Sequence, residues 1–105
     1  MNKDIEKNRK TLIRHFTMLG KTRGSCIMDC AKTHILDLFD LDHVHFAGSS
    51  GHVHPEIKEN LDMSHDEWHS MERYYEDTVN KTGGRRTFAD TADWLQTLPG
   101  WPTVL

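Results

Sequence analysis

Apolar residues at helical spacing are the feature of this chain that most constrains its fold. Within residues 3–19 they recur three, four or seven positions apart, which places them on one face of a helix: Ile5, Leu12, Ile13, Phe16 and Leu19. Gly20 follows this run and predicts the end of the helix, with a turn over residues 20–24. The chain is therefore expected to begin with an amphipathic helix that packs its apolar face against the rest of the domain.

Two later helices are expected from capping boxes, in which a serine or threonine caps the helix and an acidic residue three positions on reaches back. Ser64 with Glu67 predicts a helix that runs to about residue 80. Thr87 with Asp90 predicts a second helix that continues to Leu98. Both predictions are local, because each depends on residues within one helical turn.

Residues 26–44 fit two patterns. Ile27, Ala31, Ile35 and Leu38 have the spacing of a helix face, whereas the leucines that alternate with aspartates from residue 36 onward are typical of a strand. We expect a turn at the cysteines and a strand over 37–45, followed by a short second strand at 52–54. That second strand precedes a proline, which biases the residue before it toward extended geometry. One continuous helix over 26–41 is the alternative.

Length and charge set the class of protein. A chain of 105 residues is long enough for one domain with a modest core. It contains no apolar run of about 20 residues, so no membrane span is expected, and without an apolar signal segment we expect a cytoplasmic protein. Residues 1–24 carry seven basic and two acidic residues, whereas residues 25–80 carry three basic and twelve acidic ones. The basic segment is either a phosphate-binding face or an ordinary solvated helix.

The eight histidines are clustered in the middle of the chain. His43 and His45 follow Asp42, and a second pair stands at residues 52 and 54. On a strand, such alternation places both imidazoles on one face. His65 and His69 are four residues apart, the spacing that places both on one face of a helix.

The order of these motifs resembles the HNH (His-Me finger) endonuclease family over roughly residues 24–75. The matching features are a cysteine pair, a strand that ends in Asp42-His43, the Asn60-Leu61 dipeptide and a histidine in the following helix. The resemblance implies an α+β fold in which a small ββα-metal core is flanked by N- and C-terminal helices. The expected organisation is a single domain over 1–105, with a basic N-terminal helix (1–23), an HNH-like core (24–80) and a C-terminal helix and tail (81–105).

The resemblance also implies a set of site residues. His43 would be the general base that deprotonates water, and Asn60 would orient it. Asp42 and His69 would hold a divalent metal, which could be Mg, Mn, Ni or Zn. A structural zinc could bind Cys26, Cys30 and His65, with His34 or His52 as the fourth ligand. The cysteines are separated by three residues instead of two, and the second cysteine pair of zinc-bearing members is missing, so two small buried apolar side chains are the alternative.

The function implied by the resemblance is metal-dependent hydrolysis of DNA, alone or within a larger assembly. Basic residues from both ends and from the middle of the chain would contact DNA: Lys7, Lys10, Arg14, Arg73, Arg85 and Arg86. The alternative is a non-catalytic, helical interaction or regulatory protein with a structural or adventitious metal site, in which Trp94 and Trp101 could anchor a partner. An HNH-like protein that binds DNA or metal without cleavage is a third possibility.

Overall fold

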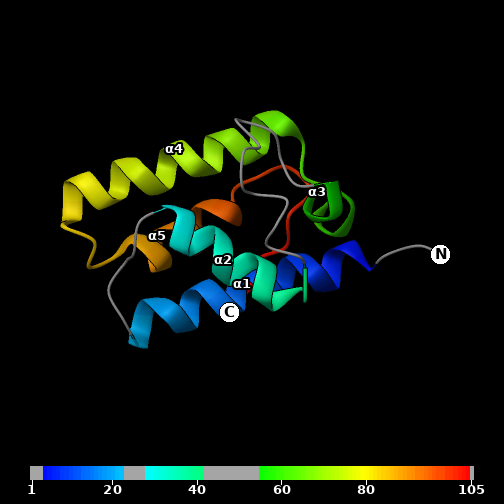
Figure 1. The fold of residues 1–105 in the computed structure, drawn as a ribbon, viewed down its shortest axis with the longest axis horizontal. Coiled ribbons are helices and arrows are strands. Elements are labelled where there is room, and N and C mark those ends of the chain that lie inside the picture. Colours follow the sequence, from blue (N-terminus) through cyan, green and yellow to red (C-terminus); the bar gives the residue numbers. More distant parts are fainter. Residues whose placement is uncertain (1–3, 23–27, 42–54, 105) are drawn as a thin grey trace.

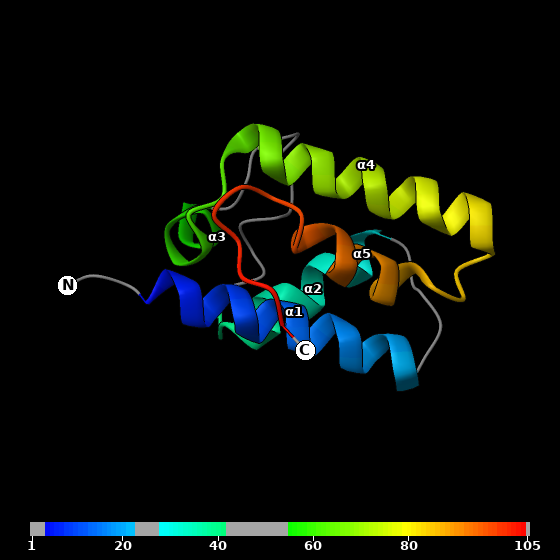
Figure 2. The same ribbon diagram turned by 180° about the vertical axis from the view of Figure 1, so that it is seen from behind.

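The computed structural model describes residues 4–22, 28–41 and 55–104, and all of its regular secondary structure there is helical (Figure 1). Within these described ranges five helices follow one another: α1 (Ile5–Thr22), α2 (Met28–Leu38), α3 (Pro55–Leu61), α4 (His65–Thr82) and α5 (Thr87–Leu95). α1 and α4 lie on opposite sides of the molecule, and α5 runs between them in the reverse direction (Figures 1 and 2). α3 packs against α1, and α2 packs against α4.

The expected α+β fold with a ββα core is wrong, because α2 occupies part of the segment in which the first strand was predicted. Residues 37 and 38 belong to the last turn of α2, and a turn follows at 39–40. Ala31 and Ile35 are fully buried, and Leu38 is partly buried against the core. The helix-face pattern therefore prevails over the alternation in this segment. Residues 42–45 of the predicted strand, and the predicted strand at 52–54, lie outside the described residues.

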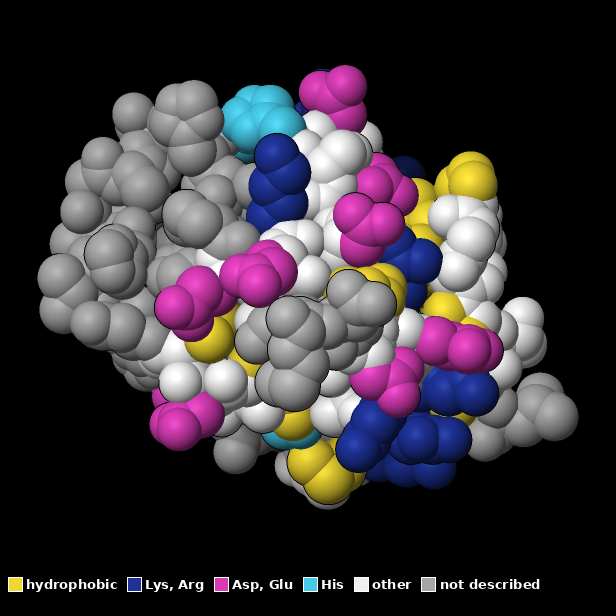
Figure 3. All heavy atoms as spheres, turned by 90° about the vertical axis from the view of Figure 1, so that its right-hand side faces the viewer, with side chains coloured by type: hydrophobic (Ala, Val, Ile, Leu, Met, Phe, Trp, Pro, Cys, Tyr) yellow, Lys and Arg dark blue, Asp and Glu magenta, His cyan; other side chains and the backbone are white. Residues whose placement is uncertain are grey.

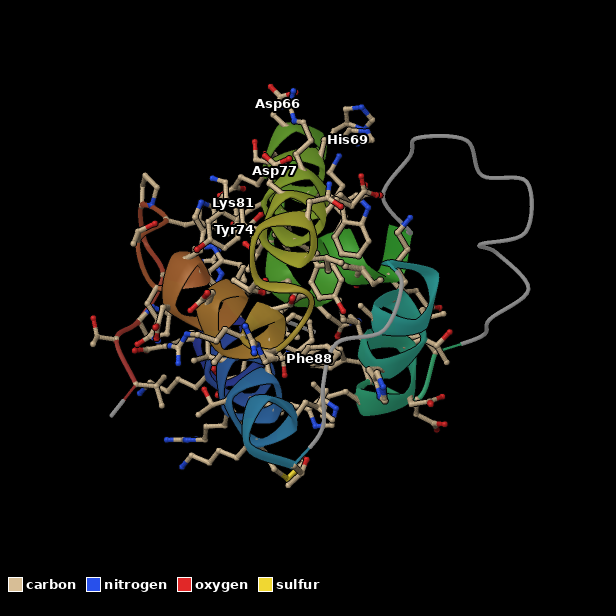
Figure 4. The ribbon with its side chains drawn as sticks, turned by 90° about the vertical axis from the view of Figure 1, so that its left-hand side faces the viewer. Asp66, His69, Tyr74, Asp77, Lys81 and Phe88 are labelled. Carbon is tan, nitrogen blue, oxygen red and sulfur yellow. The ribbon has the colours of Figure 1, made fainter. Side chains whose placement is uncertain are left out.

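The core lies where α5 meets α1 and α4. Phe88 of α5 is in its centre (Figure 4), with its ring centroid 5.4 Å from that of Phe16 in α1 and 5.6 Å from that of Tyr75 in α4. The predicted apolar face of the first helix is confirmed, since its last four members are buried: Leu12, Ile13, Phe16 and Leu19. Aromatic contacts of this kind add about 0.5–1.5 kcal/mol to the burial of apolar area.

The tryptophans near the C-terminus belong to this packed structure. Trp101 is buried, and the ring of Trp94 stacks on Tyr74 of α4 at a centroid distance of 5.4 Å and an interplanar angle of 18°. Trp101 is therefore no exposed anchor for a partner, and Tyr74 covers one face of the partly buried Trp94 ring. In the described part of the chain, no helix combines the length and the apolar character that crossing a bilayer requires.

Gly20 does not end the first helix, which continues to Thr22. A Cβ atom at residue 20 would lie 2.9 Å from the backbone nitrogen of Ala89 in α5. This distance is shorter than real Cβ contacts allow, and the neighbouring atom is backbone that cannot rotate away. Gly20 is thus the residue that lets α1 and α5 approach closely.

Gly20→Ala is expected to lower the free energy of unfolding by about 2 kcal/mol, because the added methyl group forces the two helices apart. In an exposed helix interior the same change would raise stability by up to about 1 kcal/mol. Urea unfolding followed by tryptophan fluorescence measures the difference. Lys21→Ala, on the exposed side of the same turn, is the control and should change stability by less than about 0.5 kcal/mol. A stabilised Gly20→Ala protein would contradict the close packing.

The capping box at α4 is confirmed. The Ser64 hydroxyl accepts a hydrogen bond from the Glu67 backbone at 3.1 Å, and the Ser64 backbone donates to the Glu67 carboxylate at 2.9 Å. The second predicted box is wrong: Arg86 is the N-cap residue of α5 and makes no side-chain cap. Thr87 is instead fully buried, and its hydroxyl has no hydrogen-bond partner in the described part of the chain.

Arg9 ties α1 to two distant parts of the chain. Its Nε donates to the carbonyl oxygen of Leu61 at 2.9 Å, its Nη2 to that of Asp62 at 3.1 Å and its Nη1 to that of Gly100 at 3.0 Å. The guanidinium carbon lies 4.7 Å from the ring centroid of Trp101. These contacts fix the end of α3 and the C-terminal tail on the N-terminal half of α1, and they make Arg9 a structural residue.

Candidate nucleic-acid interface

Four basic side chains lie on one face of α1. At about 100° per residue, the spacings of three, four and seven positions confine them to an arc of about 60°. We call this set the basic stripe: Lys7, Lys10, Arg14 and Lys21. Three of the four are exposed, and Lys10 is half-buried. Lys and Arg side chains gather on the side of the molecule that α1 forms, at the lower edge of Figure 3.

The charge of the basic stripe is largely unneutralised. Lys10 Nζ lies 3.7 Å from Glu6 Oε1, a pair of a kind that contributes little in solvent. Within the described ranges, Lys7, Arg14 and Lys21 form no ion pair with a carboxylate. The fold therefore presents a row of cations to solvent on a helix whose opposite face is buried.

A shallow hollow adjoins the C-terminal end of the basic stripe. It has a volume of about 230 Å³ and is lined by Arg14, Thr17, Met18, Lys21 and Val104. Met18 is half exposed, with 50% of its surface accessible. An apolar side chain thus stands beside two cations, an arrangement that suits an anionic ligand with both charged and apolar parts.

The outer face of α4 carries the opposite charge. A hollow of about 450 Å³ is lined there by Asp66, His69, Glu72, Arg73 and Glu76. Arg73, which was predicted to contact DNA, stands among these carboxylates on α4, the helix on the opposite side of the molecule from α1 (Figure 1). Figure 4 shows Asp66, His69 and Asp77 on α4 at the top of the view and α1 at the bottom. The molecule therefore has a basic side and an acidic side.

The other two predicted DNA contacts, Arg85 and Arg86, are exposed in the connection between α4 and α5. Arg86 Nη2 lies 3.3 Å from Asp90 Oδ1 in the next turn. Because Ala89 packs on Gly20, this connection stands near the C-terminal end of α1. The structure thus brings Lys7, Lys10 and Arg14 together as one surface. Lys21 was missed, although it repeats the seven-residue spacing of residues 7 and 14.

The predicted catalytic and metal-binding residues are only partly within the described residues. Asn60 lies in α3 and its amide donates to the backbone carbonyl of Glu56 at 2.6 Å. Asp42, His43 and Cys26 lie outside the described residues, and so does the side chain of Cys30. The proposed pairings of His43 with Asn60 and of Asp42 with His69 are therefore not described by the structure.

The histidines at residues 65 and 69 are adjacent on α4. Their ring centroids are 4.3 Å apart, with an interplanar angle of 79°. Among the residues that the structure describes, no group of three or more histidine, cysteine, aspartate or glutamate side chains is arranged to hold a metal ion.

The chain matches no protein-family model, no curated protein and no solved structure. A functional interpretation therefore depends on the residues themselves.

Proposed function

We propose that this protein binds double-stranded DNA through the basic stripe of α1 and does not hydrolyse it. The observation that carries the proposal is the alignment of Lys7, Lys10, Arg14 and Lys21 on one solvent-facing side of a helix. Most of the affinity of proteins for DNA comes from neutralising phosphates, and a row of cations with few carboxylate partners is suited to that role.

The basic stripe is long enough to contact several phosphates of a DNA duplex. From residue 7 to residue 21 the helix rises about 21 Å, at 1.5 Å per residue. Duplex DNA carries one charge per about 1.7 Å of its axis, so the stripe spans about six base pairs. Lysine and arginine contacts to phosphates carry no sequence information, so we expect binding that is independent of sequence.

The acidic side of the molecule gives the complex an orientation. Asp66 and Asp77 of α4 point away from α1 (Figure 4), and DNA phosphates repel such carboxylates. The net charge of −3 therefore does not exclude binding, because the charges are separated in space. This arrangement favours approach with α1 directed at the duplex.

Hydrolysis is not part of the proposal. The expectation of cleavage came from a ββα core that would bring a general base and metal ligands together, and that core is replaced by helix where the structure describes it. The proposal thus joins the non-catalytic helical interpretation to a DNA-binding surface.

Neutralising two stripe residues, with Lys7→Gln and Arg14→Gln in one protein, is expected to weaken DNA binding by about tenfold or more. The measurement is fluorescence anisotropy of a labelled 20-base-pair duplex of arbitrary sequence, in 50 mM salt. For the wild-type protein, four phosphate contacts give a slope of about −3.6 in a plot of log affinity against log salt concentration. The double variant should reduce that slope to about −1.8.

The matched control removes two positive charges from α4, with Arg73→Gln and Lys81→Gln. It has the same net charge as the stripe variant, so a difference between the two proteins reports the location of the charges. We expect the control to bind DNA like the wild type. Equal loss in both variants, or absence of wild-type binding in 50 mM salt, would refute the role of α1.

A further inference from the structure

The start of α4 holds two imidazoles in a fixed relation. The capping box of Ser64 and Glu67 sets the first turn of the helix, so His65 and His69 occupy the same face one turn apart. Their ring centroids are 4.3 Å apart. His65 is exposed, and the side chain of His69 is 33% exposed. Two histidines four positions apart on a helix form the spacing by which helices bind zinc in proteins.

The orientation of His69 is set by a carboxylate. His69 Nδ1 lies 3.2 Å from Glu72 Oε1, and the other oxygen of Glu72 lies 2.9 Å from Lys32 Nζ in α2. An imidazole whose Nδ1 faces a carboxylate ligates a metal through Nε2, its other ring nitrogen. Metal-binding histidines usually donate their other N–H to a carboxylate or carbonyl in this way, which fixes the ring.

The carboxylates around His69 favour a cation. The imidazole nitrogens determine which kind of metal ion binds. Asp66, Glu72 and Glu76 line the hollow beside His69, with Arg73 as the one cation among its lining residues. Imidazole nitrogens prefer Zn²⁺, Ni²⁺ and Cu²⁺ to Mg²⁺ and Ca²⁺, which require oxygen ligands.

From this geometry we infer that His65 and His69 together bind a divalent ion of the zinc type on the outer face of α4. Lys32 and Glu72 hold His69 in the ligating orientation. The site is on the other side of the molecule from the basic stripe, and it does not depend on DNA binding.

Zn²⁺ titration of the untagged full-length protein against a chromophoric chelator tests the inference. His65→Ala and His69→Ala should each lower the affinity of this site by at least about tenfold, because a single imidazole remains. His65 is exposed and His69 is partly exposed, and neither belongs to the apolar core, so the variants should keep the wild-type circular dichroism. Glu76→Gln removes a carboxylate from the same hollow but no imidazole, and it should change the affinity by less than about threefold.

A register control separates the pair from the mere number of histidines. The double variant His69→Ala with Ser70→His keeps eight histidines but moves one imidazole about 100° around the helix. We expect it to bind Zn²⁺ as weakly as His69→Ala. If the two alanine variants bind like the wild type, or if the register variant restores wild-type affinity, the pair is not the site and the inference fails.

Discussion

Arg9→Ala is expected to lower the free energy of unfolding by about 3 kcal/mol, the effect of losing several hydrogen bonds from a charged group at once. The guanidinium donates to three backbone carbonyls, two at the end of α3 and one in the C-terminal tail. It also lies against the face of Trp101, a contact worth about 0.5–2 kcal/mol. Its removal therefore loosens both α3 and the tail from α1, and urea unfolding with tryptophan fluorescence should detect the change.

Two variants separate this role from a general effect of charge. Arg9→Lys keeps the charge but loses the planar fork that reaches three oxygens, so we expect it to recover less than half of the lost stability. Arg14→Ala removes an exposed arginine of the basic stripe from the same helix and should change stability by less than about 0.5 kcal/mol. Equal unfolding midpoints for Arg9→Ala and Arg14→Ala would contradict the structural role of Arg9.

The parts of the fold that the sequence predicts are those determined by near neighbours. The apolar face of α1 is confirmed because its members are separated by one or two helical turns. The cap of α4 is confirmed because Ser64 and Glu67 satisfy each other within the first turn. Both patterns are physical descriptions of a single helix, and they need no knowledge of what packs against it.

The wrong predictions involve distant partners. Gly20 has the appearance of a helix stop, and only the close approach of Ala89 shows that it is a packing residue. Thr87 and Asp90 have the spacing of a capping box, but Thr87 is buried in the first turn of α5 and Arg86 is the N-cap residue. Arg9 is one of seven basic residues near the N-terminus, and its carbonyl partners are 52 to 91 positions away. Local patterns contain no information about such contacts.

The candidate DNA surface shows the same difference between residues of one helix and residues that are distant in the sequence. Of the six basic residues predicted to contact DNA, Lys7, Lys10 and Arg14 share one helix, and the structure places them on one face. Arg73 was grouped with them by charge alone, and it lies among the carboxylates of α4. Charge counted along a chain therefore identifies a surface only within a single element of secondary structure.

The α2 segment is the clearest case in which the sequence supports two structures. The spacing of Ala31 and Ile35 fits a helix, and the leucines that alternate with aspartates from residue 36 fit a strand, so the pattern alone does not decide. Tertiary contacts decide between the helix and the strand. α2 packs on α4, and Lys32 Nζ lies 2.9 Å from a carboxylate oxygen of Glu72 in that helix. Ile35 is fully buried in the resulting core.

Ile35→Asp is expected to cost more than about 5 kcal/mol, which is enough to unfold a domain of this size. The change removes a buried side chain, at about 2–5 kcal/mol, and places a carboxyl group where it has 0% exposure. The predicted result is loss of the near-ultraviolet circular dichroism and of cooperative urea unfolding.

Ile35→Val is the control for this prediction, because it removes one methylene group from the same site and should cost only about 1 kcal/mol. The comparison tests the helix itself. In the ββα arrangement, residue 35 precedes the first strand and does not belong to the helix that buries it in this structure. An Ile35→Asp protein that unfolds cooperatively at the wild-type midpoint would contradict the burial of this face of α2.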